Sequence, residues 1–367
     1  MPPARPAPGP AENDWRRPAT LGLAGSVHIE RFDAGTDRDL VRACHEMYLA
    51  AMPLDQPGEP PMSDRVFAGW LRMFWTEDRP ETWLARDATG VPTGWYSLTL
   101  PERENTHLAY LSPLVGPPHR RHGMGTALVR HAAGRAGEAG RAVLTAETTL
   151  GSPGEAFSRS LGARPGLAEA TRVLDRRAIP DGHLARLRDR ARAAAPGYSL
   201  LSWEGPAPEE YIGQVAALNQ DGEDAPRDAG REEQSWDVAR LRTAEQRIGE
   251  GGLRHYSVAA RHDRTGELVA ITQLHVDPQT PDWGGQELTV VARAHRGHRL
   301  GLLVKVAMLE LLAGREPRLE RIVTGNADSN KYMIAINAEL GYRVLDHWLN
   351  WELAVADVLA PPAATRS

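Results

Sequence analysis

The feature that most constrains this chain is a pair of segments that repeat in the same order 176 residues apart. Asp-x-Thr-Gly turns at residues 87–90 and 263–266 each lie between two short apolar runs, which predicts a β-hairpin in each segment. An Arg- and Gly-rich stretch then follows another apolar run, at residues 120–125 and 296–301. Because this period has the size of a domain, we interpret the chain as one duplicated domain and not as a solenoid of short repeats.

The two halves also correspond before and after these landmarks. Residues 161–164 match residues 340–343 at a separation of 179, and each half begins with two helical patterns joined by a polar loop. We predict the order β-α-α-β-β-β-α-β-α-β for each copy, an α/β fold with a mixed sheet flanked by helices. The predicted division is a disordered Pro- and Ala-rich tail at 1–27, an N-terminal domain at 28–178, a linker helix at 179–197, a C-terminal domain at 198–357 and a tail at 358–367.

Composition excludes several classes of protein. The 43 basic and 48 acidic side chains give a net charge of −5, which argues against a general nucleic-acid binder. All basic residues except Lys305 and Lys331 are arginine, a bias typical of GC-rich genomes, so arginine counts alone indicate no function. The single cysteine, Cys44, excludes an intrachain disulfide, and its apolar helical surroundings predict a buried core thiol. We expect no metal site.

The sequence also indicates where the protein acts. It contains no apolar stretch of the length that a membrane-spanning helix or a secretory signal needs. We therefore expect a cytoplasmic protein with neither membrane nor nucleic acid among its partners.

The Arg- and Gly-rich stretches carry the clearest chemical signal, because each lies between a predicted strand and a predicted helix. A helix N-terminus presents unpaired backbone N–H groups and the positive end of the helix dipole, and glycine lets the chain approach an anion closely. Neither stretch has the spacing of a dinucleotide fingerprint or the Gly-Lys-Ser/Thr of an ATP-binding loop. We therefore expect another pyrophosphate-bearing cofactor. An ordinary turn before a helix is the alternative for either copy taken alone.

At this point the sequence resembles a known family. The segments VGPPHRRHGMGTALV and VARAHRGHRLGLLVKVAML are similar to the acyl-coenzyme-A signature Arg/Gln-x-x-Gly-x-Gly/Ala of the GCN5-related N-acetyltransferases (GNAT). Arg120, Gly123 and Gly125 match all three fixed positions of the signature. Arg296 and Gly301 match two positions in the second copy, where an arginine replaces the middle glycine.

The resemblance covers nearly all of residues 28–178 and 198–355, in a layout similar to that of duplicated acetyltransferases such as mycothiol synthase. It implies two GNAT-like acyl-CoA N-acyltransferase domains, each with two central strands that separate at a β-bulge to admit the pantetheine arm. The residues that it implies as contacts for acetyl-CoA are Val290, Val291, Arg296, Gly297, His298, Arg299, Gly301, Leu302, Asn326 and Asn330 in the second copy, and Leu114, Val115, Arg120, Arg121, His122, Gly123, Gly125 and Thr126 in the first.

The implied activity is transfer of an acetyl group from acetyl-CoA to the primary amine of a small molecule by direct attack, with a strand N–H polarising the thioester carbonyl. Two alternatives stay open. One is an acyltransferase that uses a longer acyl-CoA or the thioester of an acyl carrier protein, and the other is a non-catalytic protein that binds or senses coenzyme A. The oligomeric state also stays open between a monomer and a homodimer.

The second copy carries the better candidates for catalysis. Glu287, at the start of the strand before the loop, is the candidate general base, and His275 on the preceding strand is the second candidate. A solvated glutamate and a structural histidine are the alternatives. The tyrosine that serves many family members as general acid falls at Asn337, and at Ser158 in the first copy, so neither copy has it. We predict that the C-terminal copy is catalytic and that the N-terminal copy binds cofactor or has a structural role.

Three polar features complete the prediction. Asn326 and Asn330 lie where the family contacts pantetheine, although Asn330 is equally suited to capping the next helix. We take Glu147 as the counterpart of Asn326 in the first copy. The acidic loop at residues 219–234 either attracts a cationic amine or is simply solvated.

Overall fold

The computed structural model describes residues 27–72 and 78–360. The N-terminal copy contains β1 (His28–Phe32), α1 (Arg38–Asp55), α2 (Asp64–Arg72), β2 (Glu81–Arg86), β3 (Pro92–Thr99), β4 (Leu108–Val115), α3 (Met124–Glu138), β5 (Val143–Thr149), α4 (Pro153–Ser160) and β6 (Arg164–Asp175). After α5 (His183–Ala193), the C-terminal copy contains β7 (Tyr198–Glu204), α6 (Ile212–Gly222), α7 (Val238–Glu250), β8 (Arg254–His262), β9 (Leu268–Val276), β10 (Trp283–Val291), α8 (Leu300–Arg315), β11 (Arg321–Ala327), α9 (Lys331–Leu340) and β12 (Arg343–Ala354), followed by α10 (Val355–Leu359). Apart from short 3-10 turns, both copies have the predicted order of helices and strands, which confirms the fold class.

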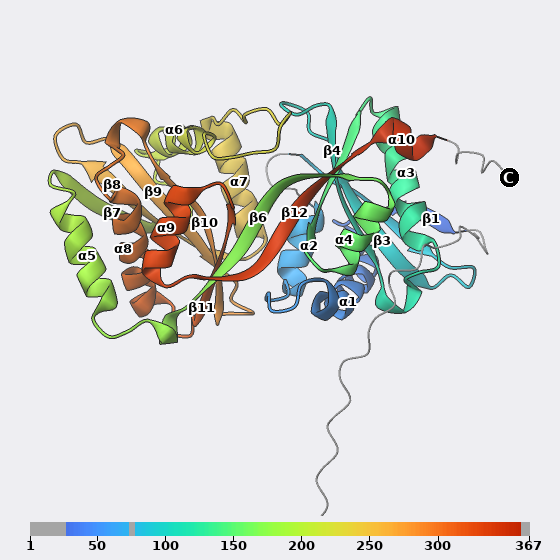
Figure 1. Cartoon of the computed structure of the whole chain (residues 1–367), viewed down its shortest axis with the longest axis horizontal. Helices are drawn as coiled ribbons and strands as arrows, with labels where there is room; N and C mark the ends of the chain where they lie inside the picture. Colours follow the sequence, from blue (N-terminus) through green and yellow to red (C-terminus); the bar gives the residue numbers. More distant parts are fainter. Residues whose placement is uncertain (1–26, 73–77, 361–367) are drawn as a thin grey trace, which may run out of the picture.

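The strands β1 to β12 form one sheet in the order β1-β2-β3-β4-β5-β12-β6-β11-β10-β9-β8-β7 (Figure 1). Because β1 to β6 correspond to β7 to β12, this order is symmetric about the antiparallel contact between β6 and β12. The last strand of each copy is exchanged, since β6 pairs with β11 and β12 pairs with β5. The predicted ranges 28–178 and 198–357 therefore describe the sequence repeat, whereas each half of the sheet is completed by a strand from the other range.

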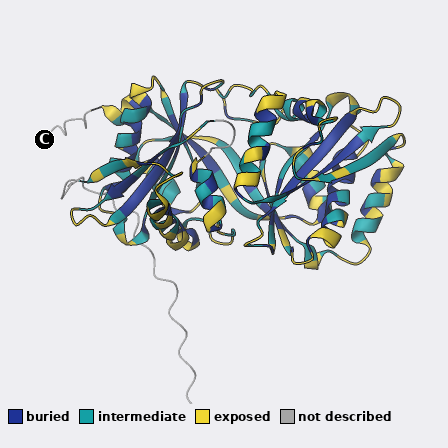
Figure 2. Cartoon of the chain, turned by 180° about the vertical axis from the view of Figure 1, so that it is seen from behind, coloured by how far each residue is buried: buried dark blue, intermediate teal, exposed yellow. Residues whose placement is uncertain are grey.

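Helices cover both faces of each half of the sheet, and the buried strands lie between them (Figures 1 and 2). In the N-terminal copy, α1 and α2 pack over Trp95, whereas α3 packs over Tyr96, because neighbouring residues of a strand point to opposite faces. The C-terminal copy repeats this arrangement, with α6 over Ile271 and α8 over Leu274. Each half of the sheet thus has one helical layer on either side.

Two helices tie the ends of the repeats into these cores. The predicted linker contains α5, which buries Leu187 and Ala191 against α8. At the chain's other end, α10 lies against α3 and places Val355 in the core of the N-terminal copy. This helix reaches Leu359, inside the range predicted as a tail, because its apolar residues have a core to pack against. Apart from Val27, the predicted tail at 1–27 lies outside the described residues, as do residues 361–367.

The acidic loop between α6 and α7 contacts the exchanged strands. Buried Asp228 accepts hydrogen bonds from the backbone N–H of Leu167 on β6 and from the side-chain amide of Asn350 on β12. Glu232 accepts a hydrogen bond of 2.7 Å from the backbone N–H of Asn105, in the N-terminal copy. These carboxylates join the two copies, which favours a structural role over an open acidic rim for amines.

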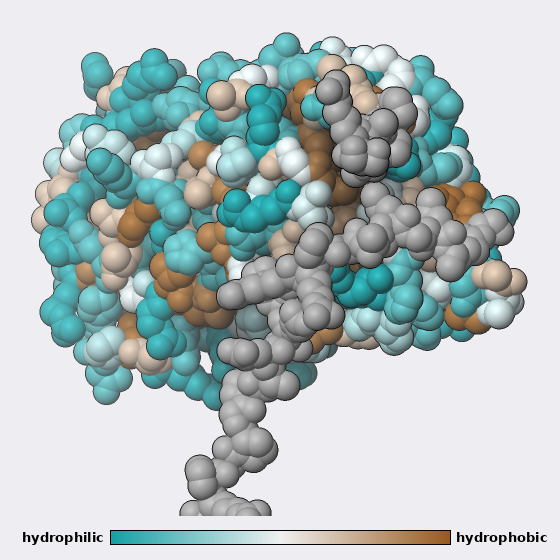
Figure 3. Space-filling view, turned by 45° about the vertical axis from the view of Figure 1, so that its right-hand side comes forward, coloured by the Kyte–Doolittle hydropathy of each residue, from teal (hydrophilic) through white to brown (hydrophobic). Residues whose placement is uncertain are grey.

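The core of the protein is apolar, and the surface seen in one view is mostly hydrophilic. Cys44 is fully buried between α1 and the sheet, and burial raises the pKa of its thiol, as expected for a core residue. In the face shown in Figure 3, hydrophilic residues predominate and apolar residues gather only in small groups. Within 27–72 and 78–360, no helix has the length and apolarity needed to cross a bilayer.

Candidate functional site

Two neighbouring parallel strands separate in each copy. The pairing of β4 with β5 extends only from Leu108 to Tyr110, and that of β10 with β11 only from Trp283 to Gly285. Beyond these residues each pair opens towards the Arg- and Gly-rich loop, which leaves a wedge with its closed end at the paired residues. The sequence resemblance implied such a gap in both copies.

The second wedge contains a β-bulge that the first wedge lacks. The register of β10 against β9 shifts between Gln286 and Thr289, which inserts one extra residue, whereas β4 follows β3 without a shift. Glu287 and Leu288 lie at this shift and together face one residue of β9, so Glu287 is in the middle of β10 and not at the strand start where the sequence analysis placed it. A bulge re-aims a side chain and leaves a backbone group unpaired. The second wedge therefore has the irregular backbone that can polarise a carbonyl.

The two Arg- and Gly-rich loops follow the same backbone path. Arg121 and Gly297 have φ values of 67° and 88°, and Gly123 and Arg299 have 81° and 54°. Arg299 thus adopts the left-handed conformation that Gly123 adopts, so the departure from the signature leaves the path unchanged. In the described part of the chain, no side chain caps the start of α3 or α8. The first backbone N–H groups of both helices therefore stay available to an anion.

Replacing Arg299 with glycine is expected to raise the free energy of unfolding by about 1 kcal/mol, because a residue with a Cβ is strained at this φ. The ion pair that the substitution removes, at 3.6 Å from Glu339, is 44% exposed on the arginine side and contributes less. Urea unfolding measures the difference. The opposite substitution at the equivalent position, Gly123→Ala, is the matched control and should lower stability. A less stable Arg299→Gly variant would show that the left-handed conformation carries no strain.

The side chain of the first arginine in each loop bonds to other residues of its own copy. Arg120 donates from Nε to the carbonyl of the last residue of β4 at 3.0 Å and forms a two-point ion pair with Asp55, at 2.8 and 2.7 Å. Arg296 repeats this geometry, with 3.1 Å to the last carbonyl of β10 and 2.6 Å to Asp224. These contacts fix each loop against the helical layer that begins the copy. We therefore assign both guanidinium groups a positioning role and expect the loop backbone to bind the anion.

The other predicted cofactor contacts divide by exposure. Gly125 and Gly301 permit close helix packing, since an added Cβ would lie 3.1 Å from Phe157 or Ile336. The side chain of Leu302 is buried in the core, which leaves its backbone N–H as the group that can reach a ligand. The remaining residues lie along the wedges and on the loops, where Val290 is buried, Leu114, Val115, Thr126 and Val291 are partly buried, and His122 and His298 are exposed.

A buried polar cluster lies behind the second wedge. The side-chain oxygen of Asn337 accepts a hydrogen bond of 2.6 Å from Lys305, and its amide donates to Asn326 at 2.7 Å. The Lys305 ammonium also lies 5.2 Å from the ring centre of Tyr342. Burial lowers the pKa of Lys305 to about 7. Because a side-chain amide donates hydrogen bonds but does not ionise near neutral pH, Asn337 is a positioning residue for this cluster and not a general acid.

Asn330 occupies the capping position that was one of its two predicted roles. Its side chain accepts a hydrogen bond of 3.3 Å from the backbone N–H of Met333 at the start of α9. This use of the side chain favours the structural alternative over a cofactor contact.

Glu287 and His275, which were predicted as separate candidates, are in contact. Oε1 of Glu287 lies 2.9 Å from Nδ1 of His275, and Oε2 lies 3.9 Å from Nε2 of His255. Burial alone would raise the pKa of Glu287, but the hydrogen bond and charge of His275, together with His255 and Arg247, lower it to about 2. The carboxylate therefore stays ionised at neutral pH and is a weak base. The contact with Glu287 instead orients the ring of His275. Nε2 of this ring lies against Gly285, where the Cβ of any larger residue would collide with it.

Sequence reasoning missed His255, on β8. Its side chain is buried, and Nε2 has no hydrogen-bond partner among the described residues. Burial lowers the pKa of His255, so the neutral ring is favoured beside Glu287. A histidine inside an apolar strand carries no local pattern that would have singled it out.

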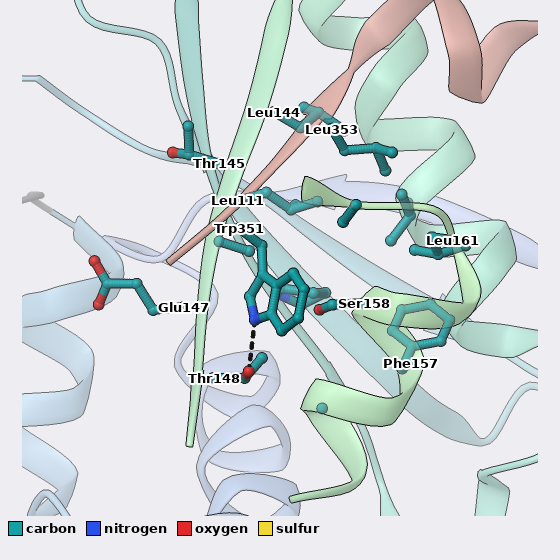
Figure 4. A pocket seen from close by; sticks show the side chains of 15 residues that line it. Leu111, Leu144, Thr145, Glu147, Thr148, Phe157, Ser158, Leu161, Trp351 and Leu353 are labelled. Atoms are coloured by element: carbon teal, nitrogen blue, oxygen red, sulfur yellow. Dashed lines mark hydrogen bonds between the residues drawn. The ribbon is translucent and has the colours of Figure 1, made fainter. Parts of the chain in front are cut away.

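The strand register corrects one predicted equivalence. The parallel pairing in the two wedges makes Thr148, and not Glu147, the counterpart of Asn326. The hydroxyl of Thr148 accepts a hydrogen bond of 2.7 Å from the indole of Trp351, on the side of α4. Glu147 points away from that indole, towards the opposite face of β5 (Figure 4). The separation between Glu147 and Asn326 is that of the segments after α4 and α9, residues 161 and 340. In the strands before these helices the separation is one residue smaller, because α9 is longer than α4.

Comparisons with known proteins agree with this geometry. Residues 41–156 match the model of the acetyltransferase (GNAT) family. The chain is 28% identical to a tandem GNAT protein from the clavulanic acid biosynthesis pathway, solved without AcCoA, with a TM-score of 0.75 over 90% of this chain and 99% of that one. A GCN5-related N-acetyltransferase from Sphaerobacter thermophilus, 14% identical, has the same fold with a TM-score of 0.62 over 91% and 97% of the two chains. No curated protein sequence matches the chain significantly.

Proposed function

We propose that this chain, whose residues 41–156 match the GNAT acetyltransferase family and whose two repeats resemble a tandem GNAT protein, transfers an acetyl group from acetyl-CoA to the primary amine of a small molecule. We place this reaction in the C-terminal copy. The observation that carries the proposal is the Glu287–His275 pair at the bulge of β10, where the strands separate. The first wedge has neither the bulge nor a carboxylate at this place.

Each residue of the pair has a distinct part in the proposed reaction. Acetyl-CoA supplies an acyl group that is activated as a thioester. His275 accepts the proton of the attacking amine at Nε2, because Nδ1 is bonded to Glu287. Glu287 fixes the tautomer of the ring and stabilises the imidazolium by its negative charge, as the carboxylate does in other histidine–carboxylate pairs. The C–N bond forms as the C–S bond breaks, and water supplies the proton to the departing thiolate.

The exchanged strands support a monomer as the working unit. Each half of the sheet already receives its final strand from within the chain, so neither half needs a second subunit to complete it. The direct contact between the two copies through β6 and β12 places both wedges in one continuous sheet.

The proposal is tested with the full chain, acetyl-CoA and a panel of small primary amines. We expect at least one amine to accelerate release of the coenzyme A thiol, with a product that mass spectrometry shows to be acetylated. Thiol release that no amine accelerates, together with measurable acetyl-CoA binding, would instead identify a coenzyme-A-binding protein without transferase activity. Amine-dependent release only from longer acyl-CoA would transfer the proposal to another donor.

A further inference from the structure

Lys305 is a buried cation that the proposed reaction does not use. Its side chain extends from α8 into the core, where it is 2% exposed, and no carboxylate of the described residues pairs with it. The equivalent residue of the first copy is Val129, which is buried on α3 without any charge. Because burying an unpaired charge costs stability and the repeat folds without it, packing does not explain this lysine. A use in the neighbouring wedge would explain why the second copy has it.

The contacts of Lys305 fix the direction of two side-chain amides. An ammonium only donates hydrogen bonds, so the atom of Asn337 that lies 2.6 Å from Nζ is the amide oxygen. The NH2 group of Asn337 then donates to Asn326 at 2.7 Å, and only the oxygen of Asn326 can accept this hydrogen bond. The NH2 group of Asn326 is consequently turned away from Asn337. In the described part of the chain this NH2 group donates to no residue.

Asn326 lies on the open part of the second wedge. The pairing of β10 with β11 ends at Gly285 and Val323, and Asn326 is three residues further along β11. The same register places Asn326 level with Leu288, in the bulge of β10. Its NH2 group is therefore opposite the irregular backbone that can polarise a thioester carbonyl.

This donor and the Glu287–His275 pair lie on opposite faces of the sheet. Asn326 bonds to α9 and alternates along β11 with Ile322, which packs against α8. His275 shares the other face with Ile271, which packs under α6. An amine that gives its proton to His275 approaches the thioester from that face. The sulfur then departs towards the opposite face, where the NH2 group of Asn326 lies.

The first copy lacks this chain of hydrogen bonds. Its residues at the three equivalent positions are Val129, Ser158 and Thr148. The hydroxyl of Thr148 accepts a hydrogen bond from the indole of Trp351 instead (Figure 4). The chain of amides is therefore restricted to the copy in which we place the reaction.

Resting on the proposed function, we propose that Lys305 is a positioning residue for acyl transfer in the C-terminal copy. Through Asn337 it directs the NH2 group of Asn326 at the sulfur of the departing thiolate. As the C–S bond breaks, its electron pair stays on the sulfur, and the hydrogen bond from Asn326 stabilises this charge until water supplies the proton. Neither Asn326 nor Lys305 loses a proton in this step.

Calorimetric titration with coenzyme A and with its sulfinate tests the inference without turnover. The sulfinate bears a permanent negative charge at the position of the sulfur, as the departing thiolate does. At about pH 6 Lys305, with a pKa of about 7, is charged, and the wild type should bind the sulfinate at one site per chain about tenfold or more tighter than coenzyme A. In Lys305→Met this preference should disappear, because neither amide is then held in direction. Any binding to the N-terminal copy is common to all variants.

A double-mutant cycle separates positioning from direct attraction by the ammonium charge. Asn326→Ala removes the proposed donor and should also abolish the preference for the sulfinate. The double variant Lys305→Met/Asn326→Ala should then equal Asn326→Ala alone, because the lysine acts through the asparagine. The matched control is Lys331→Met, the same change at the exposed lysine of α9, which should keep the full preference.

The same variants should change kcat and leave KM nearly unchanged. In Lys305→Met and in Asn326→Ala we expect kcat for acetylation to fall about tenfold or more, since a hydrogen bond to a charged sulfur is lost in the transition state. The KM for acetyl-CoA should change little, because the thioester sulfur carries no charge before the C–S bond breaks. Since Lys305→Met removes a buried unpaired charge, unfolding does not account for the loss, and urea unfolding of each variant verifies this.

The outcomes separate the inference from the proposed function. If neither coenzyme A nor its sulfinate binds, the cofactor of the proposed function is wrong and the inference fails with it. If the wild type acetylates an amine and Lys305→Met keeps both kcat and the preference for the sulfinate, the proposed function stands and the positioning role is overturned. A loss in the double variant beyond that of Asn326→Ala would show that the ammonium acts on the sulfur without the asparagine.

Discussion

The variant Glu287→Gln is expected to lower kcat by about 10²- to 10³-fold, with little change in the affinity for acetyl-CoA. The neutral amide does not stabilise an imidazolium at His275, and it fixes the ring less well than the carboxylate that now lies 2.9 Å away. Because the pKa of Glu287 is about 2, the wild-type carboxylate is ionised at every pH of an ordinary assay. Titration of Glu287 itself therefore adds no step to the pH profile of the wild type. Steady-state kinetics measure the loss of kcat.

Further variants separate this role from a general loss of structure. His275→Gln should lose a comparable factor, and the double variant should lose little more, because residues that act as a unit are not additive. Glu267→Gln makes the same chemical change at an exposed turn of the same copy and should leave kcat unchanged. Full activity in both Glu287→Gln and His275→Gln would contradict the assignment of catalysis to the C-terminal copy.

The second large effect concerns stability. Replacing Lys305 with methionine is expected to raise the free energy of unfolding by about 3 kcal/mol near neutral pH, because no carboxylate of the described residues pairs with this buried ammonium. The pKa of Lys305 is about 7 in the folded protein and about 10.5 in the unfolded chain. Below about pH 7 both states carry the proton, and the folded state bears the full cost of burying the charge. As the pH rises from about 7 to about 10.5, the folded protein has already lost this proton, and its stability rises.

The advantage of Lys305→Met over the wild type should therefore shrink as the pH increases through this window. Urea unfolding at several pH values between about 6 and 10 measures the change. The other lysine of the chain, Lys331, is exposed at the start of α9, so Lys331→Met is the matched control and should leave stability unchanged at each pH. A variant at Lys305 that is less stable at every pH would show that its hydrogen bond to Asn337 outweighs the cost of burial.

The helices and strands were predictable because their signals are local. Hydrophobic periodicity and the duplicated turns indicate which residues form each element, and both copies confirm that order. The exchange of β6 and β12 has no such signal. These strands end equivalent copies of one pattern, so either could complete either half of the sheet with the same faces buried. Which partner each strand takes depends on the connections of the whole chain.

The candidate site was predictable only in part, for a similar reason. Glu287 and His275 could be singled out by residue type, but their contact depends on one inserted residue in β10. The partners of the loop arginines, Asp55 and Asp224, lie 65 and 72 residues away along the chain, beyond the reach of a local motif. Lys305 did leave a signal, because it is a lone charged residue within the apolar helical run LGLLVKVAML.

The exchanged strands also determine when the N-terminal copy can be completed during synthesis. The edge of β5 pairs with β12, whose residues 343–354 the ribosome adds only after the rest of the second repeat. Until then the growing chain presents an open strand edge, which is a site for mispairing and aggregation. A nonsense mutation just before the codons of β12 would consequently damage the copy that was translated first.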